Sequence, residues 1–137
     1  MDPREAYDQV CFYTLAHRDP AFVHQYVVDA FAAQSADSAT RPIALTMALV
    51  GLHLHNDRGF DGRKVQEAHM KLAKSKRAWP TWFLPEERGA VGPADVLKAA
   101  EGPERDRAID AWSRSVWQAF AMNRASVTAL LAGSGVA

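Results

Sequence analysis

The sequence predicts an all-α fold, namely a compact bundle of about five to six helices with one aromatic and proline-rich crossover loop. Apolar residues recur at helical spacing in several segments, and no stretch shows the sustained alternation of β-branched residues expected of strands. The chain has 137 residues, about the length of one domain, with 48% hydrophobic and 23% charged residues. We therefore expect residues 1–137 to form a single helical domain.

The first two helices are expected at about residues 3–17 and 20–35. Pro3 suits the first turn of a helix, and the residue before Pro20 is pushed out of α geometry, which ends the first helix. Asp19 is expected to cap the second helix, with Pro20 at its first position. The main apolar stripe of the second helix consists of Val23, Val27, Ala30, Phe31 and Gln34.

The third and fourth helices are expected at about 42–58 and 63–77, joined by a turn that holds two glycines. Such a short connection makes the two helices antiparallel neighbours. Their inward faces are expected to carry Leu45, Leu49 and Leu52 on the third helix and Val65, Ala68 and Leu72 on the fourth.

Helical periodicity disappears over residues 78–92, which contain the aromatic and proline-rich segment 79–85. A segment with this composition must pack on the helices, and we expect its two tryptophans to dock on the last helix. A short helix is expected over 93–100. The last long helix is expected over 103–133, with a pause near Asn123 and an end at Gly133.

Composition limits the classes of function. Sixteen Lys and Arg residues balance sixteen Asp and Glu residues, so no global field favours nucleic acid or a membrane. Seven cations and two acids give segment 58–77 a net charge of +5, which we interpret as a solvated helix face. A single cysteine, Cys11, excludes an intramolecular disulfide. The acidic N-terminus lacks a signal-peptide pattern, so we expect a cytoplasmic protein.

Histidines are the first candidates for a functional site. His24, His55 and His69 fall on or beside the apolar faces of three different helices, and imidazole is a common ligand of transition metals. His55 and His69 would be offset by about 6 Å along adjacent helices. We therefore expect these three residues as metal ligands, with zinc as the default ion. The alternative is that each is a hydrogen-bonded core residue, because no HxxxH or HExxH spacing is present.

Asp29 is the second candidate, because it lies in the middle of an otherwise apolar helix. A buried carboxylate is costly unless it is paired or binds a ligand. Gln25 is one turn away on the same side, whereas His24 diverges from Asp29 by about 140°. Asp29 therefore either pairs with Arg41 or another cation at a helix seam, or lines a pocket with Gln34 as an orienting amide.

The tryptophans of the last long helix are a further feature. Trp112 and Trp117 are five residues apart and point to different sides of the helix. One of them is therefore expected to meet something other than the centre of the bundle. That contact is either the crossover loop or a second subunit.

Three segments together indicate a family. Residues 24–34 follow the pattern H-x4-D-A-[YF]-x2-Q, residues 91–96 are similar to a "TVADV" segment, and residues 112–120 follow W-x-x-S-V-W-x-A-[WF]. In these features the chain resembles a bacterial family catalogued only as a domain of unknown function. Longer members begin with a cysteine-rich segment and often have a histidine directly after the glutamine, whereas this chain has only Cys11 and has Ser35 at that place.

The resemblance implies no known activity, but it singles out a set of residues as the family pattern. It therefore implies a shared pocket near the second helix. The pattern consists of His24, Asp29, Gln34, Trp112 and Trp117.

Two functional hypotheses follow. The first is a helical domain whose polar pocket, lined by His24, Asp29 and Gln34, binds a metal ion or a small molecule, with catalysis left open. Histidine would serve there as a ligand or a general base, since its unperturbed pKa is near neutral. The alternative is a homodimeric protein-interaction module without catalytic activity. Nucleic acid and membranes are not expected as partners.

Overall fold

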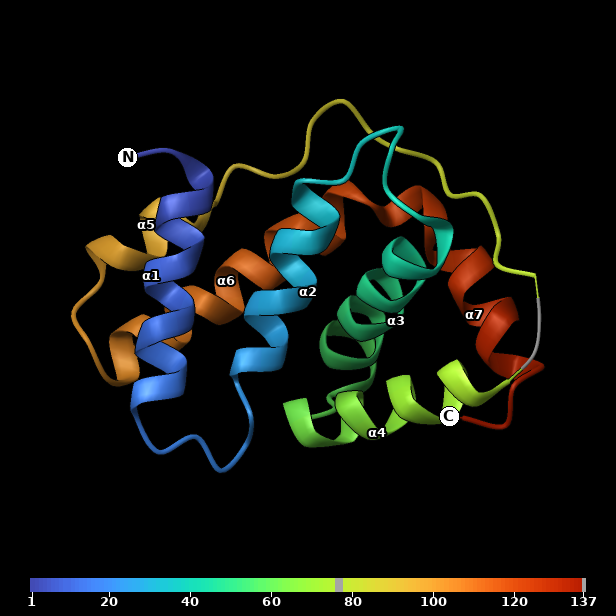
Figure 1. The fold of residues 1–137 in the computed structure, drawn as a ribbon, viewed down its shortest axis with the longest axis horizontal. Coiled ribbons are helices and arrows are strands. Elements are labelled where there is room, and N and C mark those ends of the chain that lie inside the picture. The colour runs from blue at the N-terminus through green and yellow to red at the C-terminus, as the bar shows by residue number, and fades with distance from the viewer. Residues whose placement is uncertain (76–77, 137) are drawn as a thin grey trace.

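The computed structural model describes residues 1–75 and 78–136, and its secondary structure over these ranges is entirely helical, which confirms the predicted fold class (Figure 1). The predicted last helix is divided in two by a 3-10 turn, so the described chain has seven α-helices. The elements are α1 (Pro3–Ala16), α2 (His24–Gln34), α3 (Pro42–Arg58), α4 (Gly62–Lys74), α5 (Pro93–Lys98), α6 (Pro103–Ala119), η1 (Ala121–Asn123) and α7 (Arg124–Ala132).

The helix α2 occupies the middle of the bundle. It packs against α3 on one side and against α6 on the other, and α1 and α4 also contact it. Figure 1 shows α1 and α5 at one end of the molecule and α3, α4 and α7 toward the other, with α6 running behind α2. Because α2 touches four other helices, a polar residue on it can be buried from several sides.

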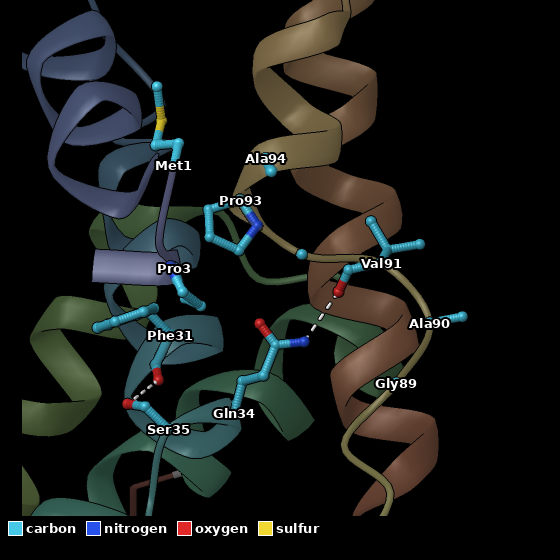
Figure 2. Close-up of a pocket in the computed structure, with 11 residues that line it drawn as sticks. Met1, Pro3, Phe31, Gln34, Ser35, Gly89, Ala90, Val91, Pro93 and Ala94 are labelled. Atoms are coloured by element: carbon cyan, nitrogen blue, oxygen red, sulfur yellow. Dashed lines mark hydrogen bonds between the residues drawn. The ribbon is translucent and has the colours of Figure 1, made fainter. Parts of the chain in front are cut away.

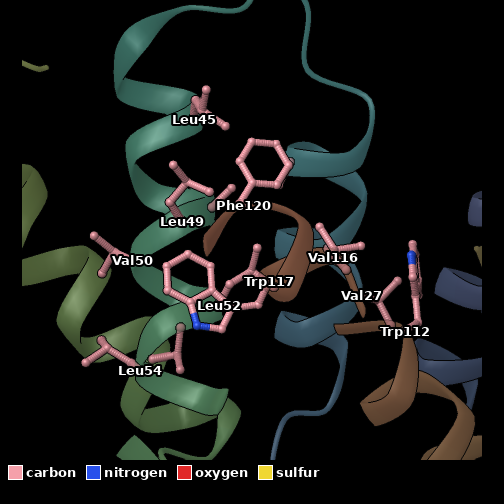
Figure 3. Packing of buried hydrophobic residues seen from close by; sticks show 14 of the residues in the cluster. Val27, Leu45, Leu49, Val50, Leu52, Leu54, Trp112, Val116, Trp117 and Phe120 are labelled. Carbon is pink, nitrogen blue, oxygen red and sulfur yellow. The ribbon is translucent and has the colours of Figure 1, made fainter. Parts of the chain in front are cut away.

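The core is built mainly by α2, α3 and α6 (Figure 3). Trp112, Trp117 and Phe120 are buried against apolar side chains that include Val27 and Leu49. Both tryptophans have an exposed fraction of 1% or less, so both are covered within one chain. Neither tryptophan therefore needs a second subunit to cover it, which was one of the two contacts expected from the sequence.

The start of α2 differs from the prediction. The Asp19 carboxylate does accept the backbone N–H of His24, at 3.0 Å, but the helix begins at His24 and not at residue 20. Phe22 has a left-handed φ of 54°, and the Gly62 N–H donates to Ala21 O at 2.9 Å. A Cβ at Gly62 would lie 1.8 Å from the Phe22 carbonyl oxygen. Because the loop before α2 lies so close to the start of α4, residues 20–23 do not adopt helical geometry.

The helix α4 ends earlier than predicted, at Lys74. Ser75 caps it, with its N–H donating to Leu72 O at 3.1 Å. The remainder of the predicted helix, residues 76–77, lies outside the described residues. The cations of α4 that are described are all exposed, in agreement with a solvated face.

The crossover segment packs on the helices, as its composition requires. Trp82 donates its indole N–H to Thr46 Oγ1 of α3 at 2.8 Å. The Asn123 side-chain amide, in η1, binds both the N–H of Phe83 at 3.0 Å and its carbonyl at 2.9 Å. Trp82 was expected to dock on the last helix, but its indole binds α3, and the contact with the last predicted helix is made by Phe83 through Asn123.

No helix in the two described ranges combines the length and apolar character that a bilayer crossing requires. The longest helices, α3 and α6, have 17 residues each, against the roughly 20 apolar residues of a typical span.

Candidate functional site

Gln34, the last residue of α2, is the centre of a hydrogen-bond network that joins three parts of the chain. Its Oε1 accepts from the Trp112 indole N–H at 2.9 Å. Its Nε2 donates to Val91 O at 2.8 Å and to Arg88 O at 3.3 Å. The side-chain amide is therefore held in one orientation by α6 and by the crossover segment. We call these four residues the Gln34 node.

The node is also where the three patterned segments of the sequence meet. Gln34 ends the first, Val91 begins the second and Trp112 begins the third. The second and third segments pack closely here, since the Val91 N–H donates to Ser115 Oγ at 3.4 Å. Gly89 lies just before the second segment and has a φ of 102°, and a Cβ there would lie 2.6 Å from Ser115 Oγ. Glycine alone can adopt this backbone conformation so close to Ser115 without displacing neighbouring atoms.

Arg88 donates hydrogen bonds to carbonyl groups at the C-terminal end of α2. This residue was not predicted from the sequence. Its guanidinium donates to Ala33 O at 3.2 Å and Ala36 O at 2.8 Å, and to Pro85 O, and it lies 5.5 Å from the centre of the Phe120 ring. The final carbonyls of a helix need such donors. The available signal was that the last turn of α2 contains no Lys, Arg or His of its own.

A pocket of about 420 Å³ opens between the end of α2 and the segment that leads into α5 (Figure 2). Phe31, Val91 and Pro93 supply apolar walls, and the Gln34 amide supplies a polar floor. Figure 2 shows the Gln34 side-chain oxygen directed into the space between Phe31 and Pro93, while its nitrogen is bound to Val91. The ring of Phe31 is fixed by stacking on Tyr7, with ring centres 4.0 Å apart.

Asp29 lies outside this pocket, at the seam between α2 and α3. It is 4% exposed, and its Oδ1 accepts from Gln25 Nε2 at 3.1 Å, which confirms the expected one-turn neighbour. No ion pair to Asp29 is found among the described residues, and Arg41 is exposed, so the alternative in which Asp29 pairs with Arg41 is wrong. Burial raises the pKa of Asp29 well above its usual value, although the Gln25 bond opposes this. Burial therefore shifts the protonation equilibrium of Asp29 toward the neutral acid.

Room for the Asp29 carboxyl group comes from Gly51 on α3. A Cβ at Gly51 would lie 1.9 Å from Asp29 Oδ2. The carboxyl group therefore occupies the volume that a side chain on α3 would otherwise fill. This arrangement places the acid inside a tight helix–helix contact.

His24 is held by α1 and does not line the Gln34 pocket. Its Nδ1 lies 2.8 Å from Thr14 Oγ1, and the Thr14 hydroxyl donates to Cys11 O at 3.0 Å. Since the hydroxyl proton is used in that bond, the His24 Nδ1 carries the hydrogen of the neutral ring. Burial lowers the pKa of His24, which the nearby Asp19 charge partly offsets. The ligand roles predicted for His24 and Asp29 stay predictions.

His55 and His69 are each bound to different groups. His55 Nε2 lies 2.6 Å from Asp110 Oδ1 and its Nδ1 3.0 Å from Phe60 O, whereas His69 Nε2 lies 2.7 Å from Met47 O. Met47 precedes His55 by eight residues, about 12 Å along the helix, so His69 is farther from His55 than the offset of about 6 Å expected from the sequence. Over residues 1–75 and 78–136, no group of three or more His, Cys, Asp or Glu side chains is placed to hold a metal ion. A zinc site stays a prediction.

A second node, around Asp57, was also missed. Asp57 Oδ2 accepts from His53 Nδ1 at 2.8 Å, from the Trp117 indole N–H at 2.9 Å and from Arg124 Nε at 3.0 Å. Burial acts to raise the pKa of Asp57, but these three donors outweigh it and lower the pKa. The spacing of four residues between His53 and Asp57 was the local signal. No local sequence pattern indicated the long-range partners, Trp117 and Arg124.

The fold and the pocket define a small all-α protein with a mainly apolar pocket that has the Gln34 side-chain amide at its base. The family model described as "Family of unknown function (DUF5946)" matches residues 4–121. The chain belongs to this family, and the matched range includes all three patterned segments. No curated protein and no solved structure shows significant similarity to the chain.

Proposed function

We propose that this protein binds a small, mainly apolar organic molecule in the Gln34 pocket. The observation that carries the proposal is the fixed orientation of the Gln34 amide at the base of a mainly apolar pocket of about 420 Å³. Ligand pockets typically have volumes of about 300–1,000 Å³ and combine apolar walls with a few oriented polar groups. Both properties are present here.

The lining indicates the chemical class of the ligand. An amide oxygen accepts two hydrogen bonds, and Trp112 uses one of them at Gln34 Oε1. The second position is suited to an O–H or N–H group of a ligand whose ring or chain contacts Phe31 and Pro93. The side chains that form the walls and the base of the pocket are uncharged, so the pocket suits a neutral molecule.

The proposal is tested by NMR titration with phenol, indole and benzamide as neutral probes. The indole N–H resonance of Trp112, assigned with the variant Trp112→Phe, reports directly on the acceptor that a ligand would share. We expect a saturable shift of this resonance and of the backbone N–H groups of residues 89–94. Binding of such small probes is expected at about millimolar concentration, in keeping with their few atoms.

Two variants that each introduce a tryptophan test where the probes bind, one inside the pocket and one, as the control, outside it. Ala94 is an exposed residue of the pocket wall, so Ala94→Trp is expected to fill the opening and abolish the shifts. Ala125 is exposed on α7, away from the pocket, so Ala125→Trp should leave them unchanged. The proposal is overturned if none of the three probes shifts the Trp112 indole resonance, or if the shifts persist in Ala94→Trp.

A further inference from the structure

A second pocket, of about 360 Å³, lies where the loop between α2 and α3 meets the crossover segment. Figure 1 shows these two segments side by side, and the pocket shares no lining residue with the Gln34 pocket. Its lining combines apolar side chains from the crossover segment and the start of α3 with a carboxylate from the loop. The apolar residues are Pro42, Leu45, Pro80, Trp82 and Leu84, and the acid is Asp37. We call it the Asp37 pocket.

Hydrogen bonds hold the apolar walls of the Asp37 pocket in place. The buried Trp82 donates its indole N–H to Thr46 Oγ1 at 2.8 Å, and the Thr46 hydroxyl donates to Pro42 O at 2.7 Å. These bonds join the crossover segment to the first turns of α3. Because the indole N–H is already used, Trp82 offers a ligand its ring and no donor.

The Asp37 carboxylate is exposed and is oriented through one of its two oxygens. Its Oδ1 accepts from the Ala39 N–H at 2.8 Å and from the Thr40 hydroxyl at 3.5 Å. Over residues 1–75 and 78–136, no donor is found for Oδ2. A carboxylate oxygen without a partner can accept hydrogen bonds from a ligand in the pocket.

No cation in the described part of the chain is paired with Asp37. Arg41, the nearest cation along the sequence, is exposed and belongs to none of the ion pairs found there. Arg88 lies close by, since it donates to Ala36 O at 2.8 Å, but its hydrogen bonds all go to main-chain carbonyls. The Asp37 pocket therefore presents a negative charge that no contact within the described residues balances.

We propose that the Asp37 pocket binds a small organic ammonium ion. The ammonium N–H groups would donate to Asp37 Oδ2, and the alkyl or aryl part would contact Trp82 and Pro80. Charge-assisted hydrogen bonds to a carboxylate are stronger than those between neutral groups, and an indole ring also attracts cations. The volume of about 360 Å³ lies within the range of about 300–1,000 Å³ that is typical of ligand pockets. The proposal does not depend on the Gln34 pocket, because the two sites use different residues.

NMR titration with n-butylammonium tests the proposal, with n-butanol as a neutral probe of matching size. Alkylamines are cations at neutral pH, as the Lys side chain is. The indole N–H resonance of Trp82, assigned with the variant Trp82→Phe, reports on the wall of the pocket. We expect a saturable shift with n-butylammonium at about millimolar concentration. n-Butanol should bind about fivefold more weakly, because it carries no charge.

Asp37→Asn removes the charge of the site and retains an oxygen that can accept from the Ala39 N–H. It should weaken n-butylammonium binding about fivefold, the upper end of the range for an exposed ion pair, and leave n-butanol binding unchanged. Glu104→Gln is the matched control, because it removes one negative charge from an exposed residue in the first turn of α6, outside the pocket. This control should bind n-butylammonium as the unchanged chain does. Circular dichroism melting checks that both exposed substitutions leave the fold intact.

The proposal is overturned if n-butylammonium gives no saturable shift of the Trp82 indole resonance up to about 100 mM. It is also overturned if n-butanol binds as tightly as n-butylammonium, or if Asp37→Asn weakens binding no more than Glu104→Gln does.

Discussion

Two polar groups on α2, the half-buried Gln34 and the buried Asp29, illustrate opposite ways of placing a polar side chain in a helical bundle. Gln34, at the end of the helix, is bound by groups from α6 and the crossover segment through three hydrogen bonds. Asp29, five residues earlier, accepts a hydrogen bond from Gln25 of its own helix and from no other side chain over residues 1–75 and 78–136, and it is accommodated by Gly51 of α3. The first group joins distant segments, whereas the second is tolerated where a neighbouring side chain is missing.

The comparison indicates that the position of a polar side chain along the helix decides which partners are within its reach. At a helix end, loop carbonyls and side chains from other elements are within reach, and they can fix an amide in one orientation. In the middle of a helix the backbone groups are already paired, so a buried carboxyl group finds few partners and its pKa rises. Binding of a ligand is therefore expected at the Gln34 end of α2.

The largest effect is expected from filling the space opposite Asp29. Gly51→Ala places a Cβ 1.9 Å from Asp29 Oδ2 and 2.6 Å from Asp29 Cγ, so either the buried carboxyl group must move against its closely packed neighbours or α2 and α3 must separate. We expect a loss of about 3 kcal/mol or more in the free energy of unfolding, at the upper end of overpacking effects. Urea denaturation measures it. In the background Asp29→Ala the same substitution should cost much less, and equal losses in both backgrounds would show that the two residues are not coupled.

Gln34→Leu is expected to have the next largest effect. The variant leaves the buried Trp112 indole N–H without its acceptor, at about 1–3 kcal/mol, and it removes the donor to the carbonyl of the half-buried Val91. We expect a loss of about 2–4 kcal/mol by urea denaturation. Gln118→Leu on the exposed side of α6 is the control and should change stability by less than about 0.5 kcal/mol. Similar losses in both variants would contradict the assigned role of Gln34.

Asp29→Asn tests the protonation state through the pH dependence of stability. Because the folded-state pKa of Asp29 is raised, the unfolded chain loses this proton at lower pH than the folded chain does. The contribution of Asp29 to the free energy of unfolding is therefore fully present below the pKa of the unfolded chain. It is lost as pH rises from about 4 to the pKa of the folded chain. The stability of Asp29→Asn relative to the original chain should therefore increase over this range, by up to about 1.4 kcal/mol per pH unit. A difference independent of pH would show that Asp29 titrates normally.

The smallest effect is expected from Gln25→Leu, which removes the donor to Asp29. We expect a cost of about 1 kcal/mol near pH 4, where the acid is neutral. The cost should grow at higher pH, because loss of this bond raises the pKa of Asp29 further. Chemical denaturation at pH 4 and pH 8 compares the two values. A cost that is larger at pH 4 would contradict the described arrangement.

Sequence reasoning located the helices because their signals are local. Pro3, Pro42, Pro93 and Pro103 lie in the first turns of observed helices, and the pause near Asn123 is a 3-10 turn. The start of α2 was predicted too early, because contact between the 19–23 loop and α4 overrides the local preference for a helix beginning at a proline. That contact joins segments about forty residues apart and has no local pattern.

The candidate site was predictable only in part, for the same reason. Gln34 was identified from its place in a patterned segment, but Arg88 and the carbonyl of Val91 lie more than fifty residues away in a loop without periodicity. The spacing of His55 and His69 was estimated from the turn that joins their helices. Tertiary packing sets a different alignment, since His69 reaches the carbonyl of Met47.

A crystal structure of the protein soaked with phenol tests the central claim most directly. The account predicts a phenol ring between Phe31 and Pro93, with its hydroxyl donating to Gln34 Oε1 while the Trp112 indole N–H retains the same acceptor. An empty pocket in crystals soaked at tens of millimolar phenol, or a Gln34 amide turned away from Trp112 and Val91, would contradict it.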